Sequence, residues 1–120
     1  MVKFIMCLHR KPGLTRAQFL DYWKNKHAPL FQSFVEVHKA RKYVQDHAMD
    51  SPVNAMLQES RGMVSEFDGV AEVWFDSEEA FIAAMSSPEG IKLGETLAAD
   101  EANFIDHTRS TAFLAREYEV

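Results

Sequence analysis

Two hydrophobic periodicities follow one another at the start of the chain. Residues 2–9, VKFIMCLH, are apolar almost throughout and rich in β-formers, which is typical of a central strand covered on both faces. The turn RKPG follows, and Thr15 with Gln18 three positions later matches a capping box, so a helix should start at 15–16. The apolar positions then take helical spacing: Phe19, Trp23, Leu30 and Phe34. This pattern predicts a helix to about residue 38, which Pro29 kinks or interrupts near residue 28.

The middle of the chain alternates without producing a clean apolar face. Residues 40–48, ARKYVQDHA, favour a strand whose two faces carry Arg41, Tyr43, Gln45 and His47 on one side, and Lys42, Val44 and Asp46 on the other. A strand this polar suggests that one face lines a wet or functional cavity. Residues 49–66 contain Ser-Pro and Arg-Gly breaks and predict a long loop with one helical turn around 53–60, a length that often has a functional role.

The last third of the chain gives the clearest pattern. Residues 68–76, DGVAEVWFD, predict a strand with Val70, Glu72 and Trp74 on one face and Ala71, Val73 and Phe75 on the other. Asp76 with Glu79 forms a capping-box pattern at the start of a helix over 77–87. Ser87 before Pro88 begins a further helix to about residue 104, and residues 111–120 predict a final strand.

The predicted order is β-α-β-β-α-β, with the second helix broken in two. This order indicates an α+β fold of the ferredoxin-like type, a four-stranded antiparallel sheet with helices on one side, built as a single domain over residues 1–120. The strands carry apolar or aromatic residues on both faces. We therefore expect a homodimer in which a second subunit covers the open face of the sheet.

Charge and composition exclude several classes of partner. The net charge is −5, and the densest cluster of basic residues is the short segment 39–42. Both features argue against nucleic acid or an anionic membrane as the main partner. The single cysteine, Cys7, excludes an intramolecular disulfide framework. No signal peptide and no apolar run of membrane-spanning length is apparent, so we predict a soluble, cytoplasmic protein.

The sequence lacks the common catalytic motifs. It contains no GxGxxG, P-loop, HExxH, CxxC or GxSxG pattern. No two of the five histidines lie four apart on one predicted helix, and carboxylates at ligand spacing are not evident. We therefore expect neither a metal nor a cofactor.

Four polar residues stand out because they interrupt apolar faces. His27 lies on the apolar stripe of the first helix, and Tyr43 and His47 share one face of the second strand. Glu72 lies between Val70 and Trp74 on a strand expected to be central. Each has a structural alternative: a hydrogen-bonded core histidine, a solvated or interface face, and a buried ion pair with an arginine such as Arg41. Together with the aromatic residues beside them, they have the composition of an apolar pocket with a few convergent polar groups.

The same residues carry a resemblance to a known family. The segment HRKPGLTRAQFLDYWKNKHAPL resembles the opening signature of EthD-domain proteins. KYVQDH and DGVAEVWFDSEEAF resemble the next two blocks of that family, and SPEG and ANFIDHTRS resemble its closing pattern. The resemblance implies a dimeric α+β barrel, a superfamily that includes cofactor-independent monooxygenases, muconolactone isomerases and small cyclases or dehydratases acting on polyketide-like aromatics. The family is often labelled oxidoreductase and was first associated with ether degradation, but its chemistry is not uniform.

The resemblance places His27 at the helix histidine of the family and Asp106 in the closing block. Our leading hypothesis is a cofactor-independent enzyme that acts on a small, mostly apolar phenolic, lactone or polyketide-like substrate by proton transfer. His27 is the candidate base or acid, His47 or Tyr43 its complement, and Glu72 the residue that orients the pair. The candidate substrate-binding residues are Trp23, Trp74, Gln45 and Asp106. Two alternatives are a cofactor-free monooxygenase and a non-catalytic metabolite-binding accessory protein of an oxygenase; a third is a structural dimer without a ligand.

Overall fold

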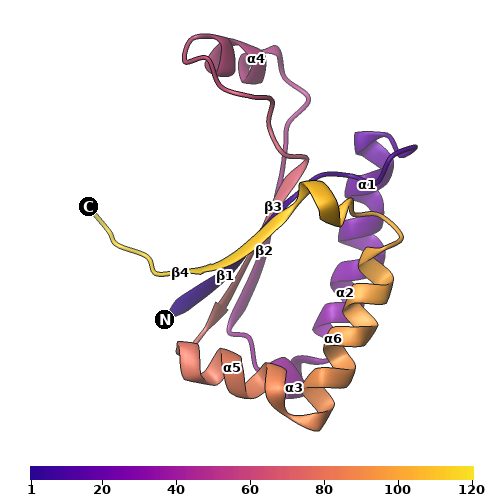
Figure 1. Cartoon of the computed structure of the whole chain (residues 1–120), viewed down its shortest axis with the longest axis vertical. Coiled ribbons are helices and arrows are strands. Elements are labelled where there is room, and N and C mark those ends of the chain that lie inside the picture. Colours follow the sequence, from indigo (N-terminus) through magenta and orange to yellow (C-terminus); the bar gives the residue numbers. More distant parts are fainter.

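A four-stranded antiparallel sheet with all the long helices on one side forms the frame of the molecule (Figure 1). The structure is a computed structural model that describes residues 1–120. The sheet order is β2-β3-β1-β4, and every neighbouring pair is antiparallel. The strands are β1 (Val2–Leu8), β2 (Lys42–His47), β3 (Gly69–Phe75) and β4 (Thr111–Ala115). This arrangement confirms the predicted ferredoxin-like α+β fold.

The helical layer is built from two stretches of chain that lie side by side (Figure 1). The first contains α1 (Arg16–Tyr22), the π-helical turn η1 (Trp23–His27), α2 (Ala28–Gln32) and α3 (Val35–His38). The second contains α5 (Glu78–Ser86) and α6 (Pro88–Glu101), and the short 3₁₀ turn η2 (His107–Arg109) leads into β4. None of these helices is long and apolar enough to cross a lipid bilayer.

The helix interruption predicted from Pro29 is a π-helical turn, η1, which lies directly before Ala28 and Pro29. Thr15 and Gln18 form the expected capping box at the start of α1. At the other end of η1, the Ala28 backbone N–H donates to the Trp23 carbonyl, five residues back instead of four. Proline lacks a backbone N–H, so widening the turn before Pro29 lets the helix continue without that donor. Both Trp23 and His27, the ends of this turn, are buried.

Several predicted boundaries are wrong. The segment 49–66 contains a full helix, α4 (Pro52–Glu59), with Ser51 as its N-cap, rather than one turn. Ser77, not Asp76, caps α5 by accepting a hydrogen bond from the Ala80 N–H. Asp76 instead accepts two hydrogen bonds from Arg41, at 2.9 and 2.7 Å. The last strand ends at Ala115 rather than at residue 120, and α6 ends three residues before residue 104.

The core lies between the sheet and the helices. The sheet register places one set of alternating residues on the helix side, and β3 shows it clearly because Ala71, Val73 and Phe75 are buried. The most deeply buried side chains are Trp23, Phe19, Phe104 and Leu8. The other face of the sheet carries Ile5, Val44, Val70, Phe113 and Trp74 around the ion pair of Lys3 and Glu72. No segment of this chain forms a layer over that open face (Figure 1).

Candidate active site

An apolar cavity of about 330 Å³ lies between the helix side of the sheet and the helices. Its walls come from β1, β2 and β3 on one side and from the first helical stretch, α5 and α6 on the other. Most of its lining is aliphatic or aromatic, and the polar side chains that reach it are His27, His38, Tyr43 and Glu101. The volume is in the range of pockets that hold small organic molecules.

The first polar group at the cavity is a histidine–aspartate pair. His27, at the end of the π turn, has its Nδ1 atom 2.7 Å from Oδ2 of Asp100 on α6. The other oxygen of Asp100 accepts a 2.6 Å hydrogen bond from the Tyr22 hydroxyl, which in turn accepts one from Asn103. Asp100 therefore orients the imidazole ring through Nδ1, and Tyr22 orients the carboxylate of Asp100.

The charge state of Asp100 fixes the tautomer of His27. Burial opposes ionisation of Asp100, but the hydrogen bonds from Tyr22 and His27 outweigh it and keep the pKa of this carboxyl below its ordinary value. The hydrogen bond to Asp100 and burial raise the pKa of Tyr22, so Tyr22 remains a donor. An ionised carboxylate only accepts hydrogen bonds, so Nδ1 of neutral His27 must carry the proton. In the neutral form of His27 the Nε2 atom then has a free lone pair, and no hydrogen bond of the protein involves this atom.

The second polar group is a chain of hydrogen bonds along β2. The Gln45 amide nitrogen donates to the Trp23 carbonyl at 3.0 Å and to the Tyr43 hydroxyl at 2.8 Å. Its oxygen is 2.8 Å from Nε2 of His47, which must donate because an amide oxygen can only accept. Burial, together with Lys24, lowers the pKa of His47 and keeps it neutral, and its ring stacks on Trp23 at 5.1 Å.

This chain leaves the hydroxyl proton of Tyr43 without an acceptor in the protein. The Tyr43 oxygen accepts from Gln45, and no protein acceptor takes its own proton. Burial raises the pKa of Tyr43, which keeps the hydroxyl protonated. The lining of the cavity therefore includes His27, whose Nε2 has no protein partner, from the helical side and Tyr43, whose hydroxyl proton has no protein acceptor, from the sheet side.

His38 also reaches the cavity, but its ring nitrogens are both used. Nε2 lies 3.0 Å from the Phe31 carbonyl, and Nδ1 accepts a hydrogen bond from the Ala40 N–H. Burial lowers the pKa of His38, in keeping with a neutral ring that stacks on Phe31 at 4.0 Å. His38 is thus a satisfied core histidine, the structural alternative that was considered for His27.

The structure brings some of the predicted site residues together and separates others. His27, Tyr43 and Trp23 line the cavity. Gln45 and His47 do not line it: Gln45 donates hydrogen bonds to Tyr43 and Trp23, and His47 stacks on Trp23. Asp106 is elsewhere, where it caps η2 by accepting from Thr108. No group of three or more His, Cys, Asp or Glu side chains is arranged to hold a metal ion.

The expected convergence of Glu72 and Trp74 with His27 is wrong. The register pairs Glu72 with Ile5 and Val44 on the open face, because odd and even positions of β3 point to opposite sides of the sheet. Glu72 forms an ion pair with Lys3 at 2.7 Å, not with Arg41. The Trp74 ring packs under the amines of Lys3 and Lys42, and its indole N–H donates to Glu117.

Sequence reasoning missed Asp100 and Tyr22. Asp100 follows Leu93 and Leu97 and precedes Phe104 at helical spacing, so it interrupts the apolar stripe of α6 just as His27 interrupts that of the first helix. That pattern was the available signal. Tyr22 gave none, because a tyrosine beside a helix stripe is common.

Comparison with known proteins assigns the chain to a family. A conidial pigment biosynthesis dehydratase, EthD, of Metarhizium robertsii is 28% identical over 114 residues, which cover 89% of this chain and 78% of that protein. The dehydratase ustZ of Ustilaginoidea virens is 26% identical over 117 residues, covering 92% and 81%. The crystal structure of an EthD-family protein of Bacillus halodurans superimposes with a TM-score of 0.64 at 25% identity, covering 98% of this chain and 99% of that one.

A more distant structure shares the fold alone. SnoaB, a cofactor-independent oxygenase of Streptomyces nogalater, superimposes with a TM-score of 0.55 at 13% identity and covers 99% of this chain and 94% of that one. The model of the EthD domain matches residues 11–108, which is most of the chain. The resemblance noted in the sequence is therefore confirmed, and this chain belongs to the EthD-domain family.

Proposed function

We propose that this chain is a cofactor-independent enzyme that moves protons on a small, mostly apolar substrate of phenolic or polyketide type. We further propose dehydration of a β-hydroxy carbonyl compound as its reaction. The observation that carries the proposal is His27, whose side chain lines an apolar cavity and whose Nδ1 lies 2.7 Å from Asp100, while its Nε2 has no hydrogen-bond partner in the protein. This is the arrangement of a general base whose tautomer and orientation are fixed by a carboxylate.

The chemistry balances without a further reagent. Nε2 of His27 takes the proton from the carbon beside the carbonyl, and the electron pair of that C–H bond becomes the carbonyl-conjugated enolate. The enolate re-forms the carbonyl and a C=C bond as the bond to the β-hydroxyl breaks. The imidazolium returns its proton to the departing hydroxyl, which leaves as water, so His27 ends neutral. Asp100 stabilises the imidazolium between these two steps.

Tyr43 has the complementary role in this proposal. Its protonated hydroxyl donates a hydrogen bond to the carbonyl oxygen of the substrate, where negative charge develops in the enolate. Gln45 and His47 keep the hydroxyl oxygen occupied as an acceptor, so that its proton is directed to the ligand. His47, expected from the sequence to act directly, has a supporting role in this proposal because its hydrogen bond goes to Gln45.

The relatives support this reaction over the alternatives. Two curated relatives at 28% and 26% identity are named as dehydratases, one of them in pigment biosynthesis. The oxygenase and accessory-protein alternatives stay open as predictions, as do the absence of a cofactor and the cytoplasmic location. We also propose a homodimer in which the open sheet face meets its counterpart, since a neighbour of the same fold from Bacteroides fragilis is described as dimeric.

The test is turnover of β-hydroxy carbonyl compounds, followed by mass spectrometry for loss of water with and without oxygen. His27→Gln should reduce turnover by roughly 10²–10⁴-fold. The matched control is His9→Gln, because His9 stacks on Phe67 outside the cavity. Wild-type binding of such compounds without turnover would support the accessory-protein alternative and overturn ours. Oxygen-dependent products from phenols would support the oxygenase.

A further inference from the structure

The segment between β2 and β3 projects from the end of the sheet as a separate arm. It comprises residues 49–66, including α4, and we call it the α4 arm. Figure 1 shows it rising beyond the ends of the strands and leaning to the side opposite the helices, which is the side of the open face. The residues that follow β4 extend toward the same side (Figure 1).

The α4 arm exposes nearly all of its large apolar side chains. No residue of α4 is buried. The six exposed apolar residues of the arm have exposed fractions between 53% and 87%: Met49, Val53, Met56, Leu57, Met63 and Val64. They make up a large share of the exposed apolar side chains of the whole molecule. Such a concentration on a monomer is typical of an interaction surface.

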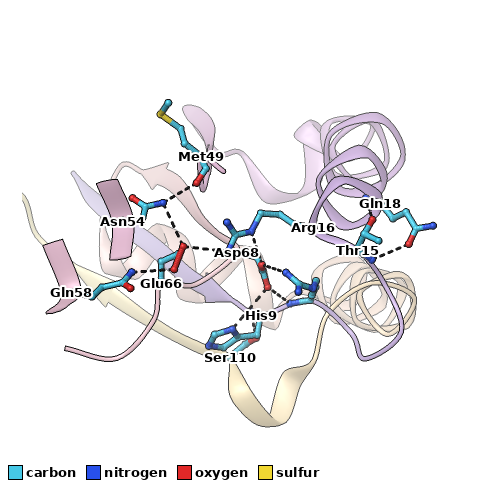
Figure 2. Close-up of polar contacts among 11 residues, drawn as sticks. His9, Thr15, Arg16, Gln18, Met49, Asn54, Gln58, Glu66, Asp68 and Ser110 are labelled. Carbon is cyan, nitrogen blue, oxygen red and sulfur yellow. Dashed lines mark hydrogen bonds and ion pairs between the residues drawn. The ribbon is translucent and has the colours of Figure 1, made fainter. Parts of the chain in front are cut away.

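Polar contacts, rather than apolar packing, hold the arm in place. Glu66 accepts hydrogen bonds from Asn54 at 3.5 Å and Gln58 at 3.0 Å, and its carboxylate lies 3.6 Å from Arg16 (Figure 2). Arg16 in turn donates to the buried Asp68 at 3.0 Å, beside the start of β3. The hydrogen bonds from Asn54 and Gln58 join parts of the arm to one another, and the ion pair with Arg16 links its last residue to α1, while the apolar side chains remain uncovered.

We propose that the α4 arm is a dimer contact and packs against the second copy of this chain. This inference extends the homodimer proposed above, but it is independent of the reaction. The arm leans to the same side of the molecule as the open sheet face, so one partner that covers the open face can also reach the arm (Figure 1). In a twofold dimer that joins the open faces, the arm at the end of each sheet overhangs the other protomer, which makes the contact self-complementary.

The exposed area fits a dimer contact. The arm offers six large apolar side chains, each more than half exposed, toward the about 800 Å² per partner that a stable complex commonly buries, and the open face adds further apolar side chains. The arm also contains Asp50, Glu59, Arg61 and Glu66, a mixed charge that shows no preference for a strongly basic or acidic partner.

The test is sedimentation equilibrium of the full chain and of three single variants. Leu57→Lys places a charge on the arm, and Phe113→Lys places one on the open face. Ile82→Lys is the matched control, because Ile82 lies on α5 and is 53% exposed, the same fraction as Leu57. Since all three side chains are about half exposed in the monomer, none of these variants should prevent folding, which circular dichroism and urea unfolding would verify.

We expect Leu57→Lys to weaken dimerisation on the order of 100-fold, because the lost contact is repeated by the twofold axis. Ile82→Lys should leave the dimer unchanged. If Phe113→Lys dissociates the dimer and Leu57→Lys does not, the homodimer stands and the arm contact is wrong. A wild-type chain that is monomeric at 100 µM, roughly the upper range of weak association, overturns both. Equal effects of Leu57→Lys and Ile82→Lys also overturn the arm contact.

Discussion

Replacing Asp100 by asparagine tests the proposed base without changing the shape of the site. The carboxylate lies 2.7 Å from Nδ1 of His27 and 2.6 Å from the Tyr22 hydroxyl, and asparagine can keep one acceptor at this position. What the substitution removes is the negative charge. In the proposed reaction His27 becomes an imidazolium only after it has taken the proton, so the charge of Asp100 matters more in the transition state than in the bound state.

The expected magnitude follows from the distance. Two unit charges separated by 2.7 Å attract by about 6 kcal/mol at an effective dielectric constant of about 20. The amide dipole of asparagine recovers part of this, which leaves a loss of roughly 3–5 kcal/mol. This corresponds to a decrease in turnover of roughly 10²–10⁴-fold. Affinity for a neutral ligand should change by less than about threefold, because no imidazolium exists in that complex.

Two measurements test the reasoning separately. Turnover and ligand affinity give the split between kcat and binding, and ¹⁵N NMR of the imidazole gives the tautomer of His27 in the resting protein. Asp21→Asn is the matched control, because Asp21 is an exposed aspartate of the first helix that only binds Asn25. If turnover of Asp100→Asn stayed within threefold of wild type, as expected for the control Asp21→Asn, His27 would not be a base that depends on a carboxylate.

Three further predictions concern the frame of the site. Tyr43→Phe should weaken binding of carbonyl ligands by about 5–20-fold in calorimetry and lower the free energy of unfolding in urea by about 1–3 kcal/mol, because it removes the hydroxyl donor and leaves one N–H of Gln45 without its acceptor. Gly69→Ala should cost about 1–3 kcal/mol and lower ligand affinity, since a Cβ at that position would lie 2.4 Å from the rigid Trp23 ring; an unchanged urea midpoint would contradict this. Asp68→Asn should cost about 2–3 kcal/mol at neutral pH, because Asp68 is 4% exposed and accepts from Arg10 and Arg16. Burial opposes ionisation of Asp68, but these bonds outweigh it and depress its pKa, so its stabilisation is present above the unfolded-state pKa of 3.8 and is lost as the pH falls through the folded-state pKa. The wild type should therefore lose more stability than the variant on acidification.

The fold could be predicted from the sequence because its signals are local. Strand alternation and the capping residues Thr15 and Ser87 fix the order of the elements, and the order suffices for a ferredoxin-like fold. The helix α4 could also have been predicted. Ser51 before Pro52 is the same helix-start signal as Ser87 before Pro88, but only the second was interpreted in that way. The capping of α5 was harder, because Asp76 and Ser77 are adjacent and both residue types cap helices well.

The candidate site was predictable only in part, because alternation shows which residues share a face but not which face is covered. On β3 both faces carry apolar residues, so the sequence did not reveal that Ala71 and Val73 face the helices while Glu72 and Trp74 do not. Only the packing of the helices decides this. His27 was recognisable since a single helix supplied both the stripe and its interruption. Its partner Asp100 is 73 positions away, and only the tertiary fold brings the two together.

The two polar networks fix which polar group at the cavity accepts a hydrogen bond and which one donates. The ionised Asp100 makes Nε2 of His27 an acceptor, and the chain from His47 through Gln45 makes Tyr43 a donor. Neither network can reverse without leaving a polar atom unpaired, which would be costly at positions this close to the core. For the substrate of the proposed reaction, we therefore expect the acidic C–H bond to lie toward the helices and the carbonyl oxygen toward β2. The apolar walls between them contribute affinity but do not orient the substrate. Its orientation in the proposed reaction therefore depends on His27 and Tyr43.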